Sequence, residues 1–206
     1  MTTLPKGKFI VIEGGDGSGK STQIKLLEKH YGDKIVTTRE PGGTPYAEAI
    51  RDVALNHELA KNAGGRTQFL LMWASRAEHM FNKIKPALRE GKIVVTDRFD
   101  SSTYAYNVCA QEEESLKEFF LETRKFILTD WVPDLYIYLD VDTEISKSRM
   151  SNRTAENHFD TKPEAFHLKV RDGYFEFFKM VPHVIINANR TPQEIFEDIC
   201  KTIDSL

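Results

Sequence analysis

A glycine-rich loop follows an apolar run near the start of the chain, in the stretch FIVIEGGDGSGKST. Residues 8–13 have the composition of a buried strand, and residues 21–31 have the apolar spacing of a helix. The residues between them fit G-x-x-x-x-G-K-[ST], in which glycines let successive backbone N–H groups converge on one anion. This strand–loop–helix order predicts a nucleotide phosphate site, with Lys20 reaching the β- and γ-phosphates and the Ser21 hydroxyl suited to Mg²⁺. The residues expected to bind ATP are Gly14, Gly15, Asp16, Gly17, Ser18, Gly19, Lys20, Ser21 and Thr22.

The same loop contains a carboxylate, Asp16, which would repel a phosphate if it faced one. As a turn residue, Asp16 would hydrogen-bond to its own backbone. As a functional residue, it would face hydrogen-bond donors such as a sugar hydroxyl of a second substrate. The loop alone leaves both interpretations open.

Short β-branched runs alternate with longer amphipathic stretches along the rest of the chain. Further strands are expected at 34–38, 92–96, 134–141 and 183–187, and further helices at 46–55, 67–81, 143–149, 163–180 and 192–205. Continuously apolar strands of this kind are typical of a parallel sheet buried on both faces under helices. We therefore predict a single doubly wound α/β domain over residues 1–206, in which the polar stretch 151–162 is a loop or a lid.

Composition limits the partners of the chain. Its 206 residues carry a net charge of −3, so no basic excess indicates a nucleic-acid polymer or an acidic membrane surface as partner. No apolar run approaches 18 residues, and Cys109 and Cys200 lack metal-site spacing. We expect a cytoplasmic protein with reduced thiols, whose bound anions meet a local positive site. The six histidines show no metal spacing and are expected to be surface or packing residues.

Charged residues follow two of the predicted strands. Asp97 and Arg98 come directly after the strand at 92–96, and Arg39 follows the strand at 34–38. Ligands of open α/β sheets bind at the carboxyl ends of the strands, where Asp97 could hold Mg²⁺ or position a phosphate and Arg98 could bind phosphate oxygens. A salt bridge at the strand end is the alternative. Arg51 and Arg76 lie on the following helices beside apolar faces, and several arginines near a triphosphate site favour a second anionic substrate.

The succession GGDGSGKST, TREPGGT, LLMWASR and DRFDSSTYAYN, followed by a polar segment with an arginine, resembles the thymidylate kinase family of the bacterial kind. The resemblance extends over residues 9–175. It implies the P-loop nucleoside-monophosphate kinase fold, with a five-stranded parallel sheet flanked by helices and a lid at about 149–162. It also implies a homodimer that catalyses ATP + dTMP → ADP + dTDP with Mg²⁺.

Matching positions in the resemblance imply a role for each substrate-binding residue. Asp16 would bind the deoxyribose 3′-hydroxyl, Arg51 and Arg98 the phosphate of dTMP, and Arg76 the thymine edge, with Tyr106 near the sugar 2′ position. The substrate site as a whole is expected to comprise Asp16, Arg39, Arg51, Phe69, Met72, Trp73, Arg76, Arg98, Ser101, Ser102, Tyr106 and Asn107.

The resemblance also implies where the catalytic cation lies. One branch of the family has an arginine in the phosphate loop where this chain has Gly17, so the lid is expected to supply the cation, from Arg153 first and Arg149 second. The expected catalytic residues are Lys20, Asp97, Arg98, Arg149 and Arg153, and the expected metal ligands are Ser21 and Asp97.

Two departures from the family pattern lie near the base. Met72 replaces a phenylalanine that stacks on thymine, and Asn107 replaces a glutamine. A broader deoxynucleoside-monophosphate kinase is therefore the alternative within the same enzyme class. A deoxynucleoside kinase would leave the extra arginines without a phosphate partner. A GTPase switch would need an Asn-Lys-x-Asp guanine reader, whereas residues 187–190 read NANR.

Overall fold

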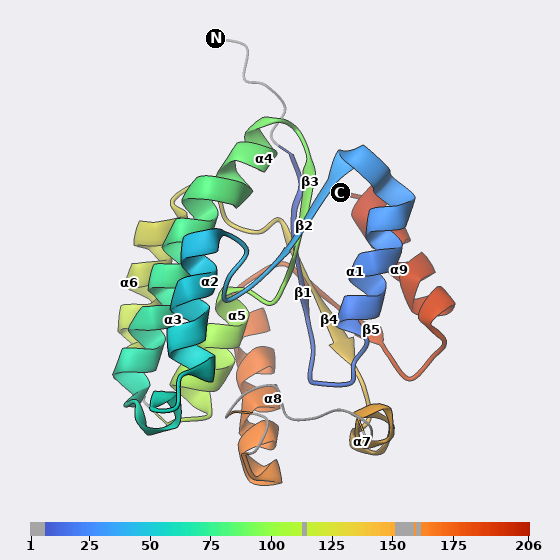
Figure 1. Cartoon of the computed structure of the whole chain (residues 1–206). Helices are drawn as coiled ribbons and strands as arrows, with labels where there is room; N and C mark the ends of the chain where they lie inside the picture. Colours follow the sequence, from blue (N-terminus) through green and yellow to red (C-terminus); the bar gives the residue numbers. More distant parts are fainter. Residues whose placement is uncertain (1–6, 113–114, 151–158, 160–161) are drawn as a thin grey trace.

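The computed structural model describes residues 7–112, 115–150, 159 and 162–206. Within them, five strands form one parallel sheet in the order β2-β3-β1-β4-β5, which confirms the expected sheet (Figure 1). The strands are β1 (Phe9–Glu13), β2 (Ile35–Arg39), β3 (Ile93–Asp97), β4 (Leu135–Asp140) and β5 (His183–Asn187). In the register, Asp97 lies beside both Ile12 of β1 and Arg39 of β2, so the charged ends of these strands meet at one edge.

Helices cover both faces of the sheet (Figure 1). They are α1 (Lys20–Tyr31), α2 (Pro45–Arg51), α3 (Gly65–His79), α4 (Lys85–Arg89), α5 (Asp100–Thr103), α6 (Leu116–Leu128), α7 (Thr143–Met150), α8 (Glu164–Phe178) and α9 (Pro192–Asp204). Single π-helical stretches continue α2, α3 and α5 at Asp52–Asn56, Met80–Ile84 and Tyr104–Cys109. None of the described helices is long and apolar enough to cross a membrane.

Strand β1 is continuously apolar because it supplies two cores. In β1, Ile10 and Ile12 pack on the side of α1 and α9, whereas Phe9 and Val11 pack on the side of α3, α6 and α8. Both sets are fully buried. Alternating residues of a strand point to opposite faces, so a strand between two helical layers needs apolar residues at every position.

Residues 100–128 contain structure that the sequence analysis did not predict. The short helix α5 begins at Asp100, whose buried carboxylate accepts hydrogen bonds from Arg124 of α6 (2.6 Å) and Tyr136 of β4 (2.6 Å). These partners come from other elements, so local propensity does not show the helix. Helix α6 is amphipathic, and it buries Leu116, Phe120 and Leu128.

The expected lid is only partly described. Helix α7 supplies its first two residues, Arg149 and Met150, whereas residues 151–158 and 160–161, including Arg153, lie outside the described residues.

Candidate active site

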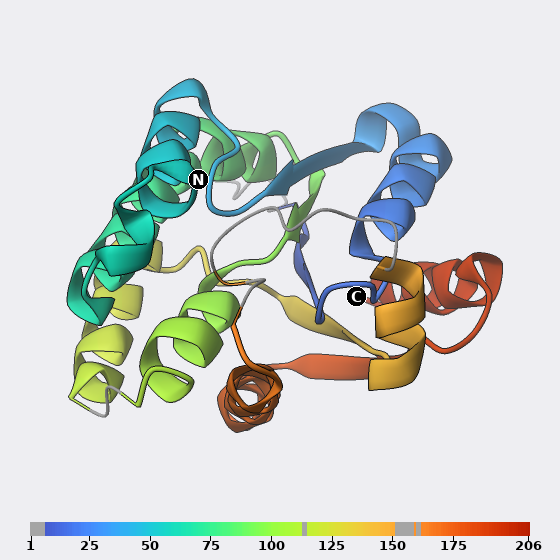
Figure 2. The same ribbon diagram turned by 60° about the horizontal axis from the view of Figure 1, so that its bottom comes forward.

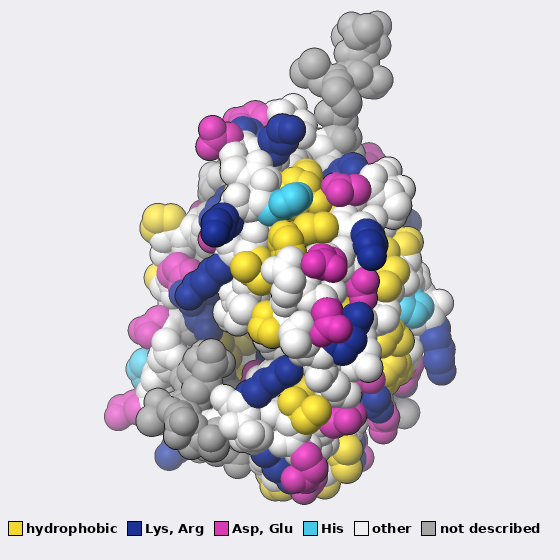
Figure 3. Space-filling model, turned by 90° about the vertical axis from the view of Figure 1, so that its right-hand side faces the viewer, with side chains coloured by type: hydrophobic (Ala, Val, Ile, Leu, Met, Phe, Trp, Pro, Cys, Tyr) yellow, Lys and Arg dark blue, Asp and Glu magenta, His cyan; other side chains and the backbone are white. Residues whose placement is uncertain are grey.

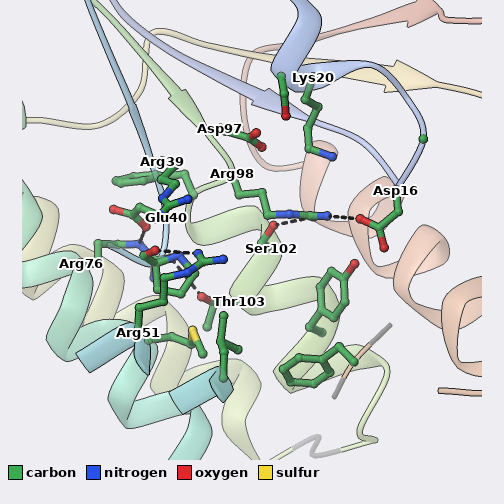
Figure 4. Close-up of a pocket in the computed structure, with 18 of the residues that line it drawn as sticks. Asp16, Lys20, Arg39, Glu40, Arg51, Arg76, Asp97, Arg98, Ser102 and Thr103 are labelled. Atoms are coloured by element: carbon green, nitrogen blue, oxygen red, sulfur yellow. Dashed lines mark hydrogen bonds and ion pairs between the residues drawn. The ribbon is translucent and has the colours of Figure 1, made fainter. Parts of the chain in front are cut away.

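A cleft of about 760 Å³ opens at the carboxyl ends of the strands, lined by residues of the phosphate loop, α3, α5 and α7 (Figure 4). Figure 2 shows these elements with this end of the sheet turned forward. The predicted residues that line it are Asp16, Gly17, Gly19, Lys20, Ser21, Thr22, Arg39, Arg51, Met72, Arg76, Asp97, Arg98, Ser102, Tyr106, Asn107 and Arg149. The cleft lining does not include Gly14, Gly15, Ser18, Phe69, Trp73 or Ser101. The structure therefore brings together residues that are up to 133 positions apart in the sequence, from Asp16 to Arg149.

The phosphate loop holds Lys20 against its own backbone. The Lys20 Nζ donates to the carbonyl oxygens of Gly14 (2.9 Å) and Gly15 (3.1 Å). Burial lowers the pKa of Lys20, and the positive charge of Arg98 lowers it further. Helix α1 begins at Lys20, so its free N–H groups and the ammonium face the same region. This is the arrangement that an anionic ligand requires.

Helix α7 rests on the same loop at Gly17. The Ser146 hydroxyl donates to the Asp16 carbonyl oxygen (2.6 Å), and the Arg149 guanidinium donates to the Gly17 carbonyl oxygen (3.2 Å). Gly17 has a φ of 72°, and a Cβ there would lie 2.9 Å from the Ser146 carbonyl oxygen. A larger residue at this position would collide with the first turn of α7, which explains why the chain needs glycine here.

Arg98 lies at the centre of the cleft (Figure 4). Its guanidinium donates to the carboxylate of Asp16 (3.1 Å) and the hydroxyl of Tyr174 (2.9 Å), and it approaches Ser102 at 3.4 Å. The backbone of Arg98 has a φ of 66°, an uncommon conformation for a non-glycine residue, and such residues often occur at functional sites. Burial raises the pKa of Asp16, but the positive charges of Arg98 and Lys20 lower it by more. The pKa of Asp16 therefore lies below its ordinary value, and the carboxyl is ionised.

Glu13, at the end of β1, was not predicted as a site residue. Its buried carboxylate accepts hydrogen bonds from the hydroxyls of Ser101 (2.7 Å), Ser102 (3.0 Å) and Tyr174 (2.9 Å), and it lies 3.8 Å from Arg98. Burial raises the pKa of Glu13, and the nearby charge of Arg98 opposes the rise. Ser101 therefore supports Glu13 from behind the cleft. An acidic residue at the end of a buried strand is the sequence signal that could have identified Glu13.

Arg76 lies at the opposite end of the cleft, on α3. Its Nε donates to the Glu40 carboxylate (2.8 Å) and its Nη2 to the Thr103 hydroxyl (3.0 Å). The guanidinium carbon lies 4.4 Å from the ring centroid of Trp73 and 5.0 Å from that of Phe99. Trp73 thus packs against Arg76 and is not part of the cleft wall.

Two buried donors that line this end of the cleft have no hydrogen-bond partner among the described residues. They are the Nη1 of Arg76 and the Nδ2 of Asn107. A buried donor without a partner costs about 1–3 kcal/mol, so such a pair in a cleft indicates that a ligand supplies acceptors. Met72 and Tyr106 line the cleft nearby, and both pack with Phe159.

Two further predicted arginines, Arg39 and Arg51, line the cleft. Arg39 is exposed and forms an ion pair with Glu48 (3.0 Å). Arg51 donates to the Pro41 carbonyl oxygen (2.8 Å), and in Figure 4 its guanidinium points toward the middle of the cleft.

Comparisons with known proteins assign the chain to a family. The family model described as thymidylate kinase matches residues 12–199. The thymidylate kinase of Clostridium novyi is 39% identical over 95% of this chain and 98% of its own length, and that of Caldicellulosiruptor saccharolyticus is 41% identical over 98% of each. A crystal structure of thymidylate kinase from Ehrlichia chaffeensis is similar with a TM-score of 0.74 and 29% identity, and the match covers 97% of this chain and 99% of that one. The chain therefore belongs to the thymidylate kinase family, and it uses ATP to phosphorylate dTMP to dTDP.

Proposed function

We propose that the donor and acceptor phosphates meet in the cleft between Lys20 and the pair Arg51 and Arg98. The main support for this proposal is that the three cationic side chains line the same cleft (Figure 4). They come from the phosphate loop, α2 and the end of β3. The phosphate loop would hold the triphosphate of ATP through backbone N–H groups and Lys20. The two guanidinium groups would hold the phosphate of dTMP as the attacking group. Phosphoryl transfer depends mainly on such positioning and on charge neutralisation.

The nucleoside of dTMP would extend from Arg98 toward Arg76. Asp16 is ionised and lies 3.1 Å from Arg98, so its carboxylate can accept a hydrogen bond from the deoxyribose 3′-hydroxyl. The unpartnered donors of Arg76 and Asn107 suit the carbonyl oxygens of thymine, and Met72 would pack on the base. Tyr106, by its position in the family pattern, would lie near C2′ and disfavour a ribose hydroxyl.

Asp97 and Ser21 would hold Mg²⁺. Both line the cleft beside Lys20, and carboxylate and hydroxyl oxygens are the donors that this ion prefers. Among the described residues no group of three or more His, Cys, Asp or Glu side chains forms a metal cage, so phosphate oxygens and water would complete the coordination. When bound, Mg²⁺ neutralises charge on the β- and γ-phosphates.

An arginine of the lid would supply a further positive charge to the transferring phosphoryl group. Residues 1–206 would form a single kinase domain, and the protein would act in the cytoplasm. Arg149 already lies against the phosphate loop at Gly17. Arg153 is outside the described residues and stays a prediction. A cation that arrives with a closing lid would neutralise the transferring group and exclude water.

A panel of acceptors tests the proposed base recognition. With ATP and the purified protein, we expect kcat/KM for dTMP to exceed that for dUMP by about tenfold, because dUMP lacks one methyl group. We expect it to exceed that for dCMP by about 10³-fold or more, because the amino group of cytosine would face the Arg76 donor. Similar values for all pyrimidines would instead support a broader deoxynucleoside-monophosphate kinase, and a preference for dAMP or dGMP would contradict the proposal.

A second copy of the chain would pack on α3 and α6. Phe81 is 72% exposed and lies eleven residues after Leu70, on the same face of α3 and its continuation. Phe126 is 80% exposed and lies seven residues after Phe119, whose ring centroid is 5.8 Å from that of Phe69 on α3. These four exposed apolar residues on two adjacent helices form the kind of patch that proteins cover by association.

Sedimentation equilibrium tests the dimer. We expect twice the 23.6 kDa chain mass for the unmodified protein and for Met180→Glu, which alters an exposed apolar residue beyond the end of α8. Phe81→Glu should shift the population to monomer, because a buried charge without a partner would oppose association. A single 23.6 kDa species for the unmodified protein would contradict the proposed dimer.

A further inference from the structure

A chain of buried hydrogen bonds runs from Arg76 away from the cleft. Arg76 Nε donates to Glu40 Oε2 (2.8 Å), Glu40 Oε1 lies 2.9 Å from His79 Nδ1, and His79 Nε2 lies 2.7 Å from the Thr38 hydroxyl. All four residues are buried, and His79 is 0% exposed. Arg76 and Glu40 line the cleft, whereas the lining includes neither His79 nor Thr38. The chain thus connects the cleft to the end of β2 through side chains of α3.

The chemistry of the four groups fixes where the protons lie. An ionised carboxylate only accepts hydrogen bonds, so the Nδ1 of His79 must carry the proton that faces Glu40. With its proton on Nδ1, the ring presents Nε2 as an acceptor for the Thr38 hydroxyl. Each group in the chain has one orientation that satisfies its neighbours.

This chain sets the direction of the Arg76 guanidinium. The planar group is held at Nε by Glu40 and at Nη2 by Thr103, and it packs against Trp73 and Phe99. Because guanidinium is planar and rigid, fixing two of its nitrogen atoms also fixes the third. The third, Nη1, is the buried donor that has no hydrogen-bond partner among the described residues.

His79 is itself held tightly against the turn after β2. Gly43 has a φ of 89°, and a Cβ there would lie 2.4 Å from His79 Nε2 and 2.6 Å from the Thr38 hydroxyl oxygen. The backbone of this turn therefore closes over the imidazole ring and leaves it no space to swing away. Because the ring is held in place, its hydrogen bond to Glu40 also fixes the position of the Glu40 carboxylate.

We propose that His79, acting through Glu40, is a positioning residue for recognition of the acceptor base. It holds Arg76 so that Nη1 faces the 4-carbonyl oxygen of a pyrimidine and cannot move to a neighbouring ring atom. This matters because cytosine carries a hydrogen-bond acceptor, N3, next to its 4-amino group. A guanidinium that can shift would reach that acceptor, and the enzyme would lose part of its discrimination against dCMP. The inference rests on the proposed role of Arg76 in base recognition.

Two substitutions at the same position separate this role from simple packing. In His79→Asn the side-chain amide nitrogen takes the place of Nδ1, so the bond to Glu40 is kept and the bond to Thr38 is lost. In His79→Gln the side-chain amide reaches the place of Nε2, where its oxygen can accept from Thr38, so the bond to Glu40 is lost. We expect the ratio of kcat/KM for dTMP to kcat/KM for dCMP to fall about tenfold or more in His79→Gln. In His79→Asn it should stay within about threefold of the unmodified protein.

The ratio is measured for two substrates on one protein sample, so a partly unfolded preparation does not alter it. The KM for ATP should change little in either variant, because neither His79 nor Glu40 contacts the phosphate loop in the described residues. Equal ratios in His79→Gln and the unmodified protein, or equal losses in both His79 variants, would overturn the inference. If neither variant folds, Glu40→Gln provides the same test, since its amide must turn a donor toward Arg76 or His79. An unchanged ratio there would equally overturn the inference.

Arg76→Lys, measured in parallel, separates this inference from the proposed function. If Arg76→Lys leaves the ratio unchanged, the proposed role of Arg76 fails, and the role of His79 fails with it. If Arg76→Lys lowers the ratio but His79→Gln does not, only the positioning role of His79 is refuted.

Discussion

Replacement of Lys20 by alanine is expected to lower kcat for dTMP phosphorylation by about 10³-fold or more. Lys20 is buried at the start of α1 and is bonded to two carbonyl oxygens of the phosphate loop, so its ammonium is already held where the β- and γ-phosphates would lie. Removing it takes away charge stabilisation at a buried position, where electrostatic interactions are stronger than in bulk water. The KM for dTMP should change by less than about threefold, because the acceptor is held by other residues. A coupled assay for ADP measures both constants.

Lys29→Ala is the matched control for Lys20→Ala. Lys29 lies in the last turn of the same helix, is exposed, and is not part of the cleft lining. It should retain near-normal kcat. Turnover by Lys20→Ala within about tenfold of the unmodified enzyme would contradict the placement of the triphosphate on this loop.

The second large effect is expected at Arg98. Arg98→Met keeps much of the side-chain length but removes the guanidinium, and we expect kcat/KM for dTMP to fall by about 10³-fold. The loss should exceed that from replacement of the exposed Arg39, because Arg98 is held by Asp16, Tyr174 and Ser102. Arg98→Lys should recover only part of the activity. The ammonium of lysine lacks the planar set of donors with which a guanidinium can bind these side chains and two phosphate oxygens at once.

Stability measurements separate the catalytic loss at Arg98 from misfolding. Arg98→Met also leaves the carboxylates of Asp16 and Glu13 without their nearest cation, so the midpoint of thermal unfolding should decrease as well. The control is Arg190→Met, which removes an arginine that precedes α9, pairs with Asp198 of that helix and is not part of the cleft lining. Near-normal kcat/KM for dTMP in folded Arg98→Met would rule out Arg98 as the phosphate-binding residue.

Much of the fold could be predicted from the sequence. The five strands begin and end within a residue or so of their predicted positions, because strands with helices on both faces are continuously apolar and end where the chain becomes polar. The phosphate loop could also be predicted from the sequence, since its glycines and Lys20 occur at a fixed spacing. Helices α4, α5 and α6 lie outside the predicted helices, and α5 depends on bonds between Asp100 and residues 24 and 36 positions away.

Which neighbours face the cleft could not be read from the sequence. Met72 and Arg76 are four residues apart and line it, whereas Phe69 and Trp73, also four apart, turn toward the core. In a helix of 3.6 residues per turn, the mean directions of these two pairs differ by only about 60°, and only the packed structure shows which pair faces the ligand.

The buried acids Glu13 and Glu40 are the other part of the site that sequence reasoning did not reach. Their partners lie between 36 and 161 positions away, so the pairs form only when the sheet and helices have assembled. The role of His79 was also not predicted. Both of its ring nitrogens form hydrogen bonds, but their partners, Thr38 and Glu40, are distant in the sequence.

The most direct test of the account is a crystal structure with Mg²⁺ and a bisubstrate mimic, in which thymidine and adenosine are joined through a polyphosphate. Such a complex would also show whether Arg149 or Arg153 reaches the bridging phosphates and whether the metal lies between Ser21 and Asp97. The account predicts that the phosphate nearest thymidine lies within hydrogen-bond distance of Arg51 and Arg98, with the adenosine end on the phosphate loop beside Lys20. A thymidine-end phosphate bound away from both arginines would contradict it.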